Sequence, residues 1–337
     1  MRRLFVCCVA VAAAASAADV KPGKNRADEP FAKVASLERA AAFLDAAGAD
    51  WTANRKCTTC HTNAPHLMAR PVLGAKATAE EQAVRKFFEE RAANWDRGGK
   101  GDAPRWDTEV VVTGVTLAFH DAQTTGKLHP MTRKALDRMW TLPMKAGTWN
   151  WLKCNWPPME HDDYFGAVYA AVGVGVAPEG YAKTDAAKAG VARLKAYFDK
   201  TPAPTLHHKA WLLWASRKLD GLMGEGEQRK VVAELRSRQR DDGGWSLSSL
   251  GDWKGFDGRK NDVDAPSDGY GTGLVVYVLR QAGVSADDPA MKRGAAWLRS
   301  NQRESGRWFT RSLNKDGTHY MTHAGTAFAL MALKACE

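Results

Sequence analysis

Three Gly-x-Trp tripeptides recur along this chain, and their spacing restricts the fold more than any other feature. They are Gly147-Thr148-Trp149, Gly243-Gly244-Trp245 and Gly306-Arg307-Trp308, and each follows a segment with helical periodicity. A fourth, weaker turn is expected between Gly48 and Trp51. The intervals from Trp51 to Trp149 and from Trp149 to Trp245 are each about twice a unit of roughly 48 residues. The interval from Trp245 to Trp308 is longer than one unit and shorter than two. It fits one unit if the polar stretch 251–266 is an insertion.

The helical patterns are of two alternating kinds, which predicts six helix pairs. The first kind has charged residues on one face and apolar residues on the other, as outer helices do, and includes 36–47, 80–93, 131–142, 185–199, 227–239 and 289–301. Ser36 and Asp185 are the expected N-caps of two of them. The second kind is apolar nearly all round and comprises 109–122, 164–176, 209–219, 270–282, 322–335 and a segment after Cys57. We expect an all-α fold, a single (α/α)6 barrel, with a flat superhelix of the same pairs as the alternative.

The C-terminal repeat motifs resemble those of a known superfamily. Residues 293–298 with Gln302 and 306–308 resemble the QW repeat of squalene cyclases, and Leu235, Gln239, Gly243 and Trp245 repeat its second half. The chain therefore resembles a single-barrel member of the terpenoid cyclase and protein prenyltransferase superfamily, strongly from Glu227 to Cys336, moderately from Met131 and weakly before that. We expect each Gln to bond backbone groups at a helix end and each Trp to pack between repeats, so that both are structural.

The first residues are predicted to be a targeting segment. Met1-Arg2-Arg3 is a charged start, an apolar run extends to Ala17, and Ala15-Ser16-Ala17 forms an A-x-A cleavage site. We expect residues 1–18 to be a signal peptide and 19–337 to be the barrel, exported to the periplasm or the extracellular space without a transmembrane segment. The net charge of +10 is dispersed along the chain, which argues against nucleic-acid binding.

The sharpest local signal is Cys57-Thr58-Thr59-Cys60-His61, the attachment pattern of a c-type haem. In this interpretation Cys57 and Cys60 form thioethers with the haem and His61 is an axial ligand. The second axial ligand is open, among His66, Met68, His161, His207 and His323. Two alternatives remain: a zinc site that uses the cysteines with His61 or His66, and a redox dithiol or disulfide between Cys57 and Cys60.

The barrel register brings polar residues to one end. In an alternating barrel the starts of all inner helices lie at the same rim, and those starts carry acidic and imidazole side chains: Asp107, Glu160, His161, Asp162, Asp163, His207, His208, Asp268, His319 and His323. Inner-helix N-termini favour anions at this rim. Any single Asp in this set could equally be a helix cap. We also expect Cys154 near this mouth and Cys336 at the opposite end, too far apart for a disulfide.

The resemblance to the cyclases extends only in part to their acid motif. The superfamily's acid motif is DxDD, and in Asp268-Gly269-Tyr270-Gly271 only the first Asp is retained. Glu160-His161-Asp162-Asp163 is a partial substitute, and clustered carboxylates can keep one another protonated as a general acid. The candidate catalytic residues are therefore Glu160, Asp162, Asp163 and Asp268.

Together these features predict a c-type haem protein that works in electron transfer or in redox chemistry on a ligand in the barrel. A redox partner protein is expected in the first case. In the second, an isoprenoid-like hydrophobic ligand could lie against Tyr164, Trp211, Trp214 and Tyr277, although core packing explains these residues equally well. The alternatives are a haem-free terpenoid cyclase-like enzyme or lyase that uses the carboxylates, and a non-catalytic binding module.

Overall fold

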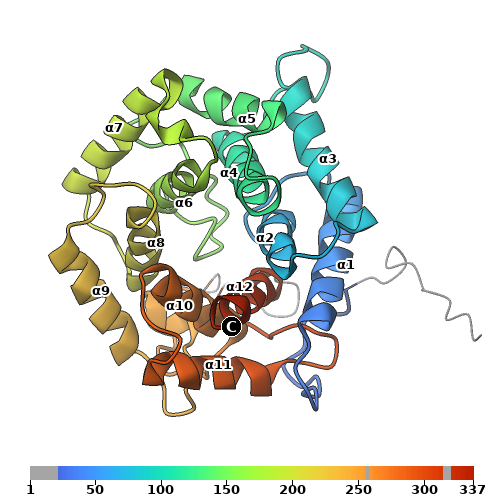
Figure 1. Ribbon diagram of the computed structural model, residues 1–337, viewed down its shortest axis with the longest axis vertical. Helices are drawn as coiled ribbons and strands as arrows, with labels where there is room; N and C mark the ends of the chain where they lie inside the picture. Colours follow the sequence, from blue (N-terminus) through green and yellow to red (C-terminus); the bar gives the residue numbers. More distant parts are fainter. Residues whose placement is uncertain (1–21, 256–257, 314–319) are drawn as a thin grey trace, which may run out of the picture.

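Two concentric rings of helices make up the molecule (Figure 1). The computed structural model describes residues 22–255, 258–313 and 320–337. The predicted signal peptide and His319 lie outside these residues. Within them the regular structure is helical, with only three isolated β-bridges, so the prediction of an all-α (α/α)6 barrel is confirmed.

Outer and inner helices alternate along the chain. The outer helices are α1 (Leu37–Arg55), α3 (Ala79–Asn94), α5 (Pro130–Thr141), α7 (Asp185–Lys200), α9 (Glu225–Ser237) and α11 (Pro289–Asn301). The inner helices are α2 (Asn63–Ala69), α4 (Asp107–Thr124), α6 (Asp163–Val176), α8 (Leu206–Ser216), α10 (Gly269–Gln281) and α12 (Met321–Ala335). Short 3-10 turns follow α2 (Arg70–Leu73), precede α7 (Tyr181–Lys183) and precede α10 (Leu247–Leu250).

The three Gly-x-Trp turns have one common geometry. Each Trp is almost fully buried, and its indole Nε1 donates a hydrogen bond to the carbonyl ten residues earlier: Trp149 to Met139 at 2.9 Å, Trp245 to Leu235 at 2.7 Å and Trp308 to Leu298 at 2.7 Å. The bond fixes the chain against the outer helix that it has just left. The predicted fourth turn is wrong, because Gly48 and Trp51 both lie inside α1.

The glutamines of these repeats join neighbouring outer helices. Gln239 Nε2 donates to the carbonyls of Gly243 and Ala290 at 2.9 and 2.8 Å. Gln302 Nε2 donates to the carbonyls of Gly306 and Ser36, both at 2.8 Å, while its Oε1 accepts from the Ser36 amide at 2.7 Å. Gln302 therefore joins the last repeat to the first and closes the ring, which confirms the expected structural role.

Of the two predicted N-caps, Ser36 is confirmed and Asp185 is not. The Ser36 side chain accepts from the Arg39 amide and caps α1. Asp185 is the first helical residue of α7, and the N-cap is Thr184, so the predicted cap is displaced by one residue. The acidic side chain still lies in the first turn, where it faces the positive end of the helix dipole.

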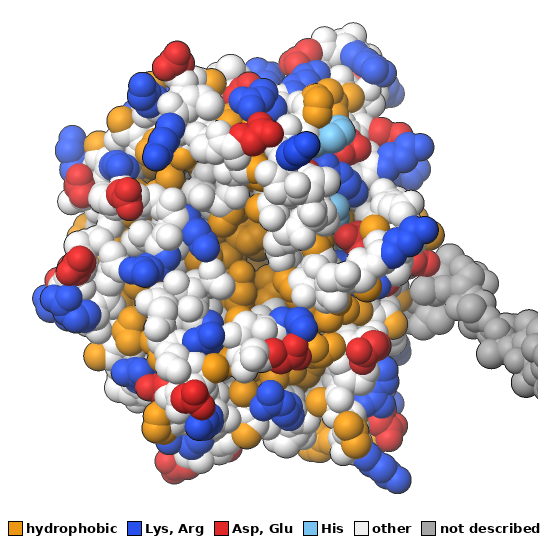
Figure 2. Space-filling view, in the orientation of Figure 1, with side chains coloured by type: hydrophobic (Ala, Val, Ile, Leu, Met, Phe, Trp, Pro, Cys, Tyr) orange, Lys and Arg blue, Asp and Glu red, His pale blue; other side chains and the backbone are white. Residues whose placement is uncertain are grey.

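The inner helices run in the same direction, so the barrel has two different ends. The C-terminus of α12 lies on the face shown in Figure 2, where hydrophobic side chains surround a central hollow and charged side chains lie toward the rim. The N-termini of the inner helices lie at the other end, here called the mouth. The connection from α5 to α6, residues 142–162, has no helix and lies at this mouth. Among the described residues, no helix is long and apolar enough to cross a membrane.

Candidate functional site

The Cys-x-x-Cys-His segment forms the turn that leads into α2. Asn63, the first residue of α2, fixes the turn, because its Oδ1 accepts from the Thr59 amide at 2.9 Å and its Nδ2 donates to the Cys57 carbonyl at 3.0 Å. Cys57 is half-buried, whereas Cys60 and His61 are buried. Both cysteines are free.

Cys60 and His61 face the same carboxylate at the mouth. Glu160 Oε1 lies 3.9 Å from Cys60 Sγ and 3.6 Å from His61 Nε2. Burial raises the pKa of Glu160 to about 7, although hydrogen bonds from Cys154 and Cys60 oppose this shift. Near neutral pH this carboxyl therefore exists in both protonation states and can give or take a proton.

Cys154 belongs to the same cluster, as its predicted place near the mouth requires. Its amide donates to the Glu160 carbonyl at 3.1 Å. Burial raises the pKa of its thiol, and the Glu160 carboxylate adds to the shift. Burial also raises the pKa of Cys57 and Cys60, again with a contribution from Glu160. All three thiols are thus held in the protonated form around one carboxyl group. Cys336 caps α12 at the opposite end and is free as well.

His61 is connected to a second histidine through Thr62. His61 Nδ1 lies 2.8 Å from Thr62 Oγ1, which lies 3.0 Å from His323 Nδ1. Burial, with a smaller effect of the Arg307 charge, lowers the pKa of His323 to about 4, so this imidazole is neutral at physiological pH. His61, Thr62 and His323 thus form a hydrogen-bonded row, and Glu160 lies 3.6 Å from the other ring nitrogen of His61.

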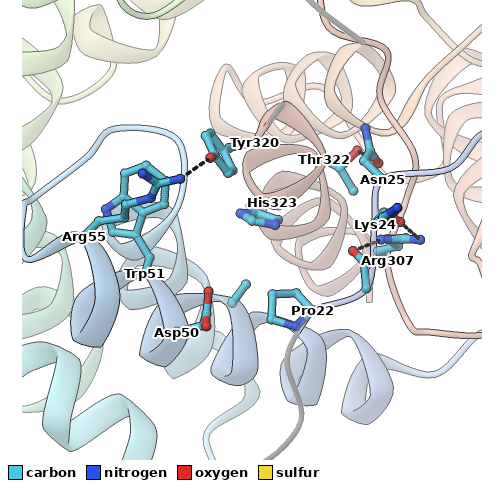
Figure 3. A pocket seen from close by; sticks show the side chains of 12 residues that line it. Pro22, Lys24, Asn25, Asp50, Trp51, Arg55, Arg307, Tyr320, Thr322 and His323 are labelled. Carbon is cyan, nitrogen blue, oxygen red and sulfur yellow. Dashed lines mark hydrogen bonds between the residues drawn. The ribbon is translucent and has the colours of Figure 1, made fainter. Parts of the chain in front are cut away.

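Trp51 and Tyr320, which contact the His61 ring, also line a cavity of about 240 Å³ (Figure 3). The Tyr320 ring stacks on the His61 ring with centroids 4.9 Å apart, and Trp51 meets the same imidazole edge-on at 4.9 Å. Arg55 donates to the Tyr320 hydroxyl at 3.3 Å. Figure 3 shows Trp51, Tyr320 and His323 on one side of the cavity and Arg307 with Lys24 on the other.

Asp162 and Asp163, two of the predicted catalytic carboxylates, have structural partners. Asp162 is the N-cap of α6, because its Oδ1 accepts from the Phe165 amide at 2.9 Å, and the same oxygen lies 3.2 Å from His208 Nε2. Asp163 pairs with Lys153 at 2.5 Å and accepts from the Trp151 amide at 2.9 Å. Burial tends to raise the pKa of Asp162, but the His208 hydrogen bond outweighs it and the pKa is lowered, whereas the pKa of Glu160 is raised to about 7.

Asp268 and His207 lie at the starts of neighbouring inner helices. Asp268 caps α10 and accepts from the Gly271 and Leu247 amides at 2.8 and 2.6 Å, while burial raises its pKa to about 6. His207 Nε2 lies 2.8 Å from the Tyr270 hydroxyl and accepts from Trp211 Nε1 at 3.2 Å. Burial lowers the pKa of His207 far below its usual value, so this ring is neutral.

His66, His161 and Asp107 were also predicted to be site residues. His66 Nε2 contacts Asp45 Oδ1 at 2.7 Å, in a buried group with Arg70. His161 Nδ1 is buried without a hydrogen-bond partner. Asp107 is the first residue of α4, and burial raises its pKa. In the part of the chain that the structure describes, no group of three or more His, Cys, Asp or Glu side chains is arranged to hold a metal ion.

The Cys-x-x-Cys-His segment contains the donor types that a c-type haem requires, two thiols and an adjacent imidazole. The ligating nitrogen of His61 and the sulfur of Cys60 point toward the same carboxylate oxygen, and Glu160 influences the titration of all three thiols. Cys60 and His61 therefore face the same carboxylate, as two residues that hold one group would. The connection 142–162 carries this carboxylate.

The inner wall proposed for a hydrophobic ligand is packed with side chains. Trp211 and Trp214 are fully buried with ring centroids 5.1 Å apart, and Phe328 meets Trp211 edge-on at 5.7 Å. Tyr277 meets Trp214 edge-on at 5.1 Å, and Tyr164 packs on Phe198 at 5.4 Å. In this structure these aromatic residues are core.

Thr62 and Tyr320 are site residues that the sequence does not predict, and Trp51 lies in α1 and not in a turn. Thr62 follows His61 directly, so its closeness to the imidazole could have been inferred from the chain. Tyr320 precedes α12 and reaches His61 only because the ring closes, a contact between residues far apart in sequence. That contact depends on the barrel geometry, and periodicity carries no signal for it.

Comparison with known proteins supports the fold and adds no family. No protein-family model matches the sequence, and no curated protein does. A solved structure described as a polysaccharide lyase superposes with a TM-score of 0.52 and 11% sequence identity, over 90% of this chain and 98% of that chain. An identity this low shows a shared fold alone. The protein is thus of the α/α toroid class, with a thiol, imidazole and carboxyl cluster at the mouth of its barrel.

Proposed function

We propose that this protein carries a covalent c-type haem, attached through Cys57 and Cys60 with His61 as axial ligand, and acts in electron transfer or redox chemistry at the barrel mouth. The observation that supports it most is the convergence of Cys60 Sγ and His61 Nε2 on one point at the mouth, 3.9 and 3.6 Å from Glu160 Oε1. Attachment takes place outside the cytoplasm, which agrees with the predicted signal peptide. The squalene cyclase resemblance concerns the scaffold and is part of the same proposal.

The bound haem would supply one-electron redox chemistry, and the surrounding residues would control it. Thr62 Oγ1, 2.8 Å from His61 Nδ1, fixes the orientation of the imidazole and its basicity. Tyr320 and Trp51 hold the ring from two sides. Glu160 can take up or release a proton near neutral pH, which would balance a change of charge beside it.

The test is an absorption spectrum of the protein exported by a host that matures c-type cytochromes. We expect a Soret band that stays with the polypeptide after acid-acetone extraction. Cys57→Ala and Cys60→Ala should each lose one thioether bond, and the double variant Cys57→Ala/Cys60→Ala should lose covalent attachment altogether. Cys154→Ala is the matched control, because it removes a thiol from the same cluster but not from the motif. A wild-type protein that is folded and free of haem would overturn the proposal.

A second candidate function is acid–base catalysis without haem, as in a lyase. The observation in its favour is the Glu160 carboxyl with a pKa of about 7, 3.6 Å from the His61 imidazole, which can serve as an acid and base pair. The structure that shares this fold is described as a polysaccharide lyase. If the purified protein is colourless, turnover of candidate polysaccharides that Glu160→Gln abolishes and Asp163→Asn retains would favour this function. A non-catalytic binding module predicts turnover by neither wild type nor variant.

A further inference from the structure

A second cavity at the mouth lies apart from the cysteine cluster. It has a volume of about 580 Å³ and lies between the polar stretch before α10 and the segment before α12. Trp253 and Phe309 contribute aromatic side chains to its lining, and Asp268 lies at one side. The Trp253 ring meets the His207 ring edge-on at 5.7 Å, so this lining residue also packs against the inner helix α8. The polar stretch, read as an insertion into the repeat, thus provides much of the cavity wall.

Among the described residues, the charged side chains that line this cavity are mostly basic. They are the cationic Arg259, Lys260, Arg303 and Arg311 and the acidic Asp262 and Asp268. The Asp268 carboxylate is engaged by the helix that it caps, since it accepts two backbone amides and the Thr310 hydroxyl at 3.3 Å. The electrostatic potential of the cavity therefore favours an anionic ligand.

Two lining residues also have hydrogen-bonding groups without a partner. The Asn261 side chain donates through Nδ2 to the carbonyl of Ser248 at 2.6 Å, while its Oδ1 is buried and unpartnered. Arg303 Nε is buried and unpartnered as well, although Arg303 Nη1 donates to the Glu29 carbonyl at 2.6 Å. One group is an acceptor and the other a donor. Hydroxyl groups can accept from the one and donate to the other, whereas inorganic sulfate has no hydrogen to donate to the Asn261 oxygen.

We propose that this cavity binds an acidic oligosaccharide, a short chain of sugar rings that carry carboxylate or sulfate groups. The basic side chains would contact the acid groups, the serine and asparagine side chains would contact ring hydroxyls, and the partly exposed Phe309 would contact an apolar ring face. A single small anion would leave most of the volume unused. The proposal does not depend on haem attachment at Cys57 and Cys60.

The experiment is calorimetric titration of the purified full-length exported protein with trigalacturonate. The matched ligand is its methyl ester, which has the same rings without charge. We expect the acid to bind, the ester to bind at least about tenfold more weakly, and added salt to weaken binding of the acid. The double variant Arg259→Ala/Lys260→Ala should lose about tenfold in affinity, because both side chains are exposed at the cavity edge.

The control variant is Arg229→Ala/Lys230→Ala, an exposed basic pair on α9 remote from the cavity lining, which should bind as the wild type does. A sulfated oligosaccharide of equal length forms the third arm, and binding of it alone would assign the acid group as sulfate. Equal binding of acid and ester, equal loss in both double variants, equally tight binding of inorganic sulfate, or no binding of either acidic oligosaccharide would each overturn the proposal.

Discussion

At the scale of single residues, the functional character of the mouth depends on Glu160. Other carboxylates of the rim, such as Asp162 and Asp268, accept backbone amides and serve as helix caps. Glu160 instead lies in the connection before α6, where its side chain is 13% exposed and faces two thiols and an imidazole. Burial without a full set of donors explains why its pKa is about 7.

The raised pKa of Glu160 makes stability depend on pH. In the unfolded chain this carboxyl titrates near its ordinary value of 4.5, and in the folded protein near 7, so the folded state binds the extra proton between these values. Its contribution to the free energy of unfolding is therefore complete below pH 4.5 and is lost as the pH rises through 7, by about 3 kcal/mol in total. Urea unfolding of wild type and Glu160→Gln between pH 5 and 8 measures this effect.

The expected result is that wild type loses stability relative to Glu160→Gln as the pH rises. The control is Glu227→Gln, an exposed residue paired with Lys230 on α9, whose difference from wild type should not vary over this range. Subtraction of the curves removes the titration of His323 and Asp268, which is common to all three proteins. Parallel curves for wild type and Glu160→Gln would show that Glu160 is already ionised at pH 5.

The hydrogen bonds of Thr62 with His61 and His323 lead to a second prediction at this scale. Thr62→Val removes the hydroxyl between the two imidazoles but keeps the size of the side chain, so both Nδ1 atoms lose a partner at 2.8 and 3.0 Å. If haem is attached, we expect its reduction potential to change while covalent attachment is retained. Thr58→Val, in the same turn with a hydroxyl that has no partner, is the control. Equal potentials in wild type and Thr62→Val would show that Thr62 does not tune the axial ligand.

The sequence predicted which residues share the mouth, but not what each of them does. The common direction of the inner helices placed Glu160, His207 and Asp268 at one end, because helix polarity follows from the alternation of the pairs. The conformation of the connection 142–162 has no periodicity to reveal it. Consequently the sequence could not separate the capping Asp162 from Glu160, or show that His66 contacts Asp45.

At the scale of elements, the repeat depends on a glycine with a backbone conformation that side chains rarely adopt. Gly306 has φ +92°, and an added Cβ would overlap the Arg39 carbonyl of the next outer helix. Because Gly306 has no side chain, the turn 306–308 can lie directly on α1. The Gly-x-Trp pattern was readable from sequence because this close approach and the buried indole both require specific residue types.

We predict that Gly306→Ala destabilises the protein much more than Gly283→Ala. Gly283 has φ +91°, nearly the same conformation, but an added Cβ there would have no neighbour within 4 Å. Gly283→Ala should thus cost only the backbone strain, about 1 kcal/mol, while Gly306→Ala adds the displacement of α1 for a total of about 3 kcal/mol or more. Chemical denaturation measures both. Similar losses in the two variants would show that contact with α1 has no energetic role.

At the scale of the whole molecule, the barrel is stable only if its last repeat meets its first. Gln302 makes one such connection, and the segment 22–32 makes another by crossing from the last turns to α1. Glu29 accepts from Arg307 Nε at 2.6 Å and from the Ser305 amide at 2.8 Å, and the Arg303 guanidinium lies 4.0 Å from the centre of the Phe31 ring. The sequence predicted a closed ring, but it carried no periodic signal for this segment, because its contacts are single polar bonds.

We therefore predict that Glu29→Gln weakens ring closure. Arg307 is 5% exposed, so loss of the carboxylate leaves a buried guanidinium with carbonyl partners only, at a cost of about 3 kcal/mol. Hydrogen exchange should rise first in α1 and α12, the two helices that meet at the closure, and remain low in α4 and α6 across the barrel. Glu225→Gln, an exposed residue paired with Arg229, should change neither property. Uniform acceleration of exchange in all inner helices would instead show that the ring unfolds as one unit, without a weakest contact between its first and last repeats.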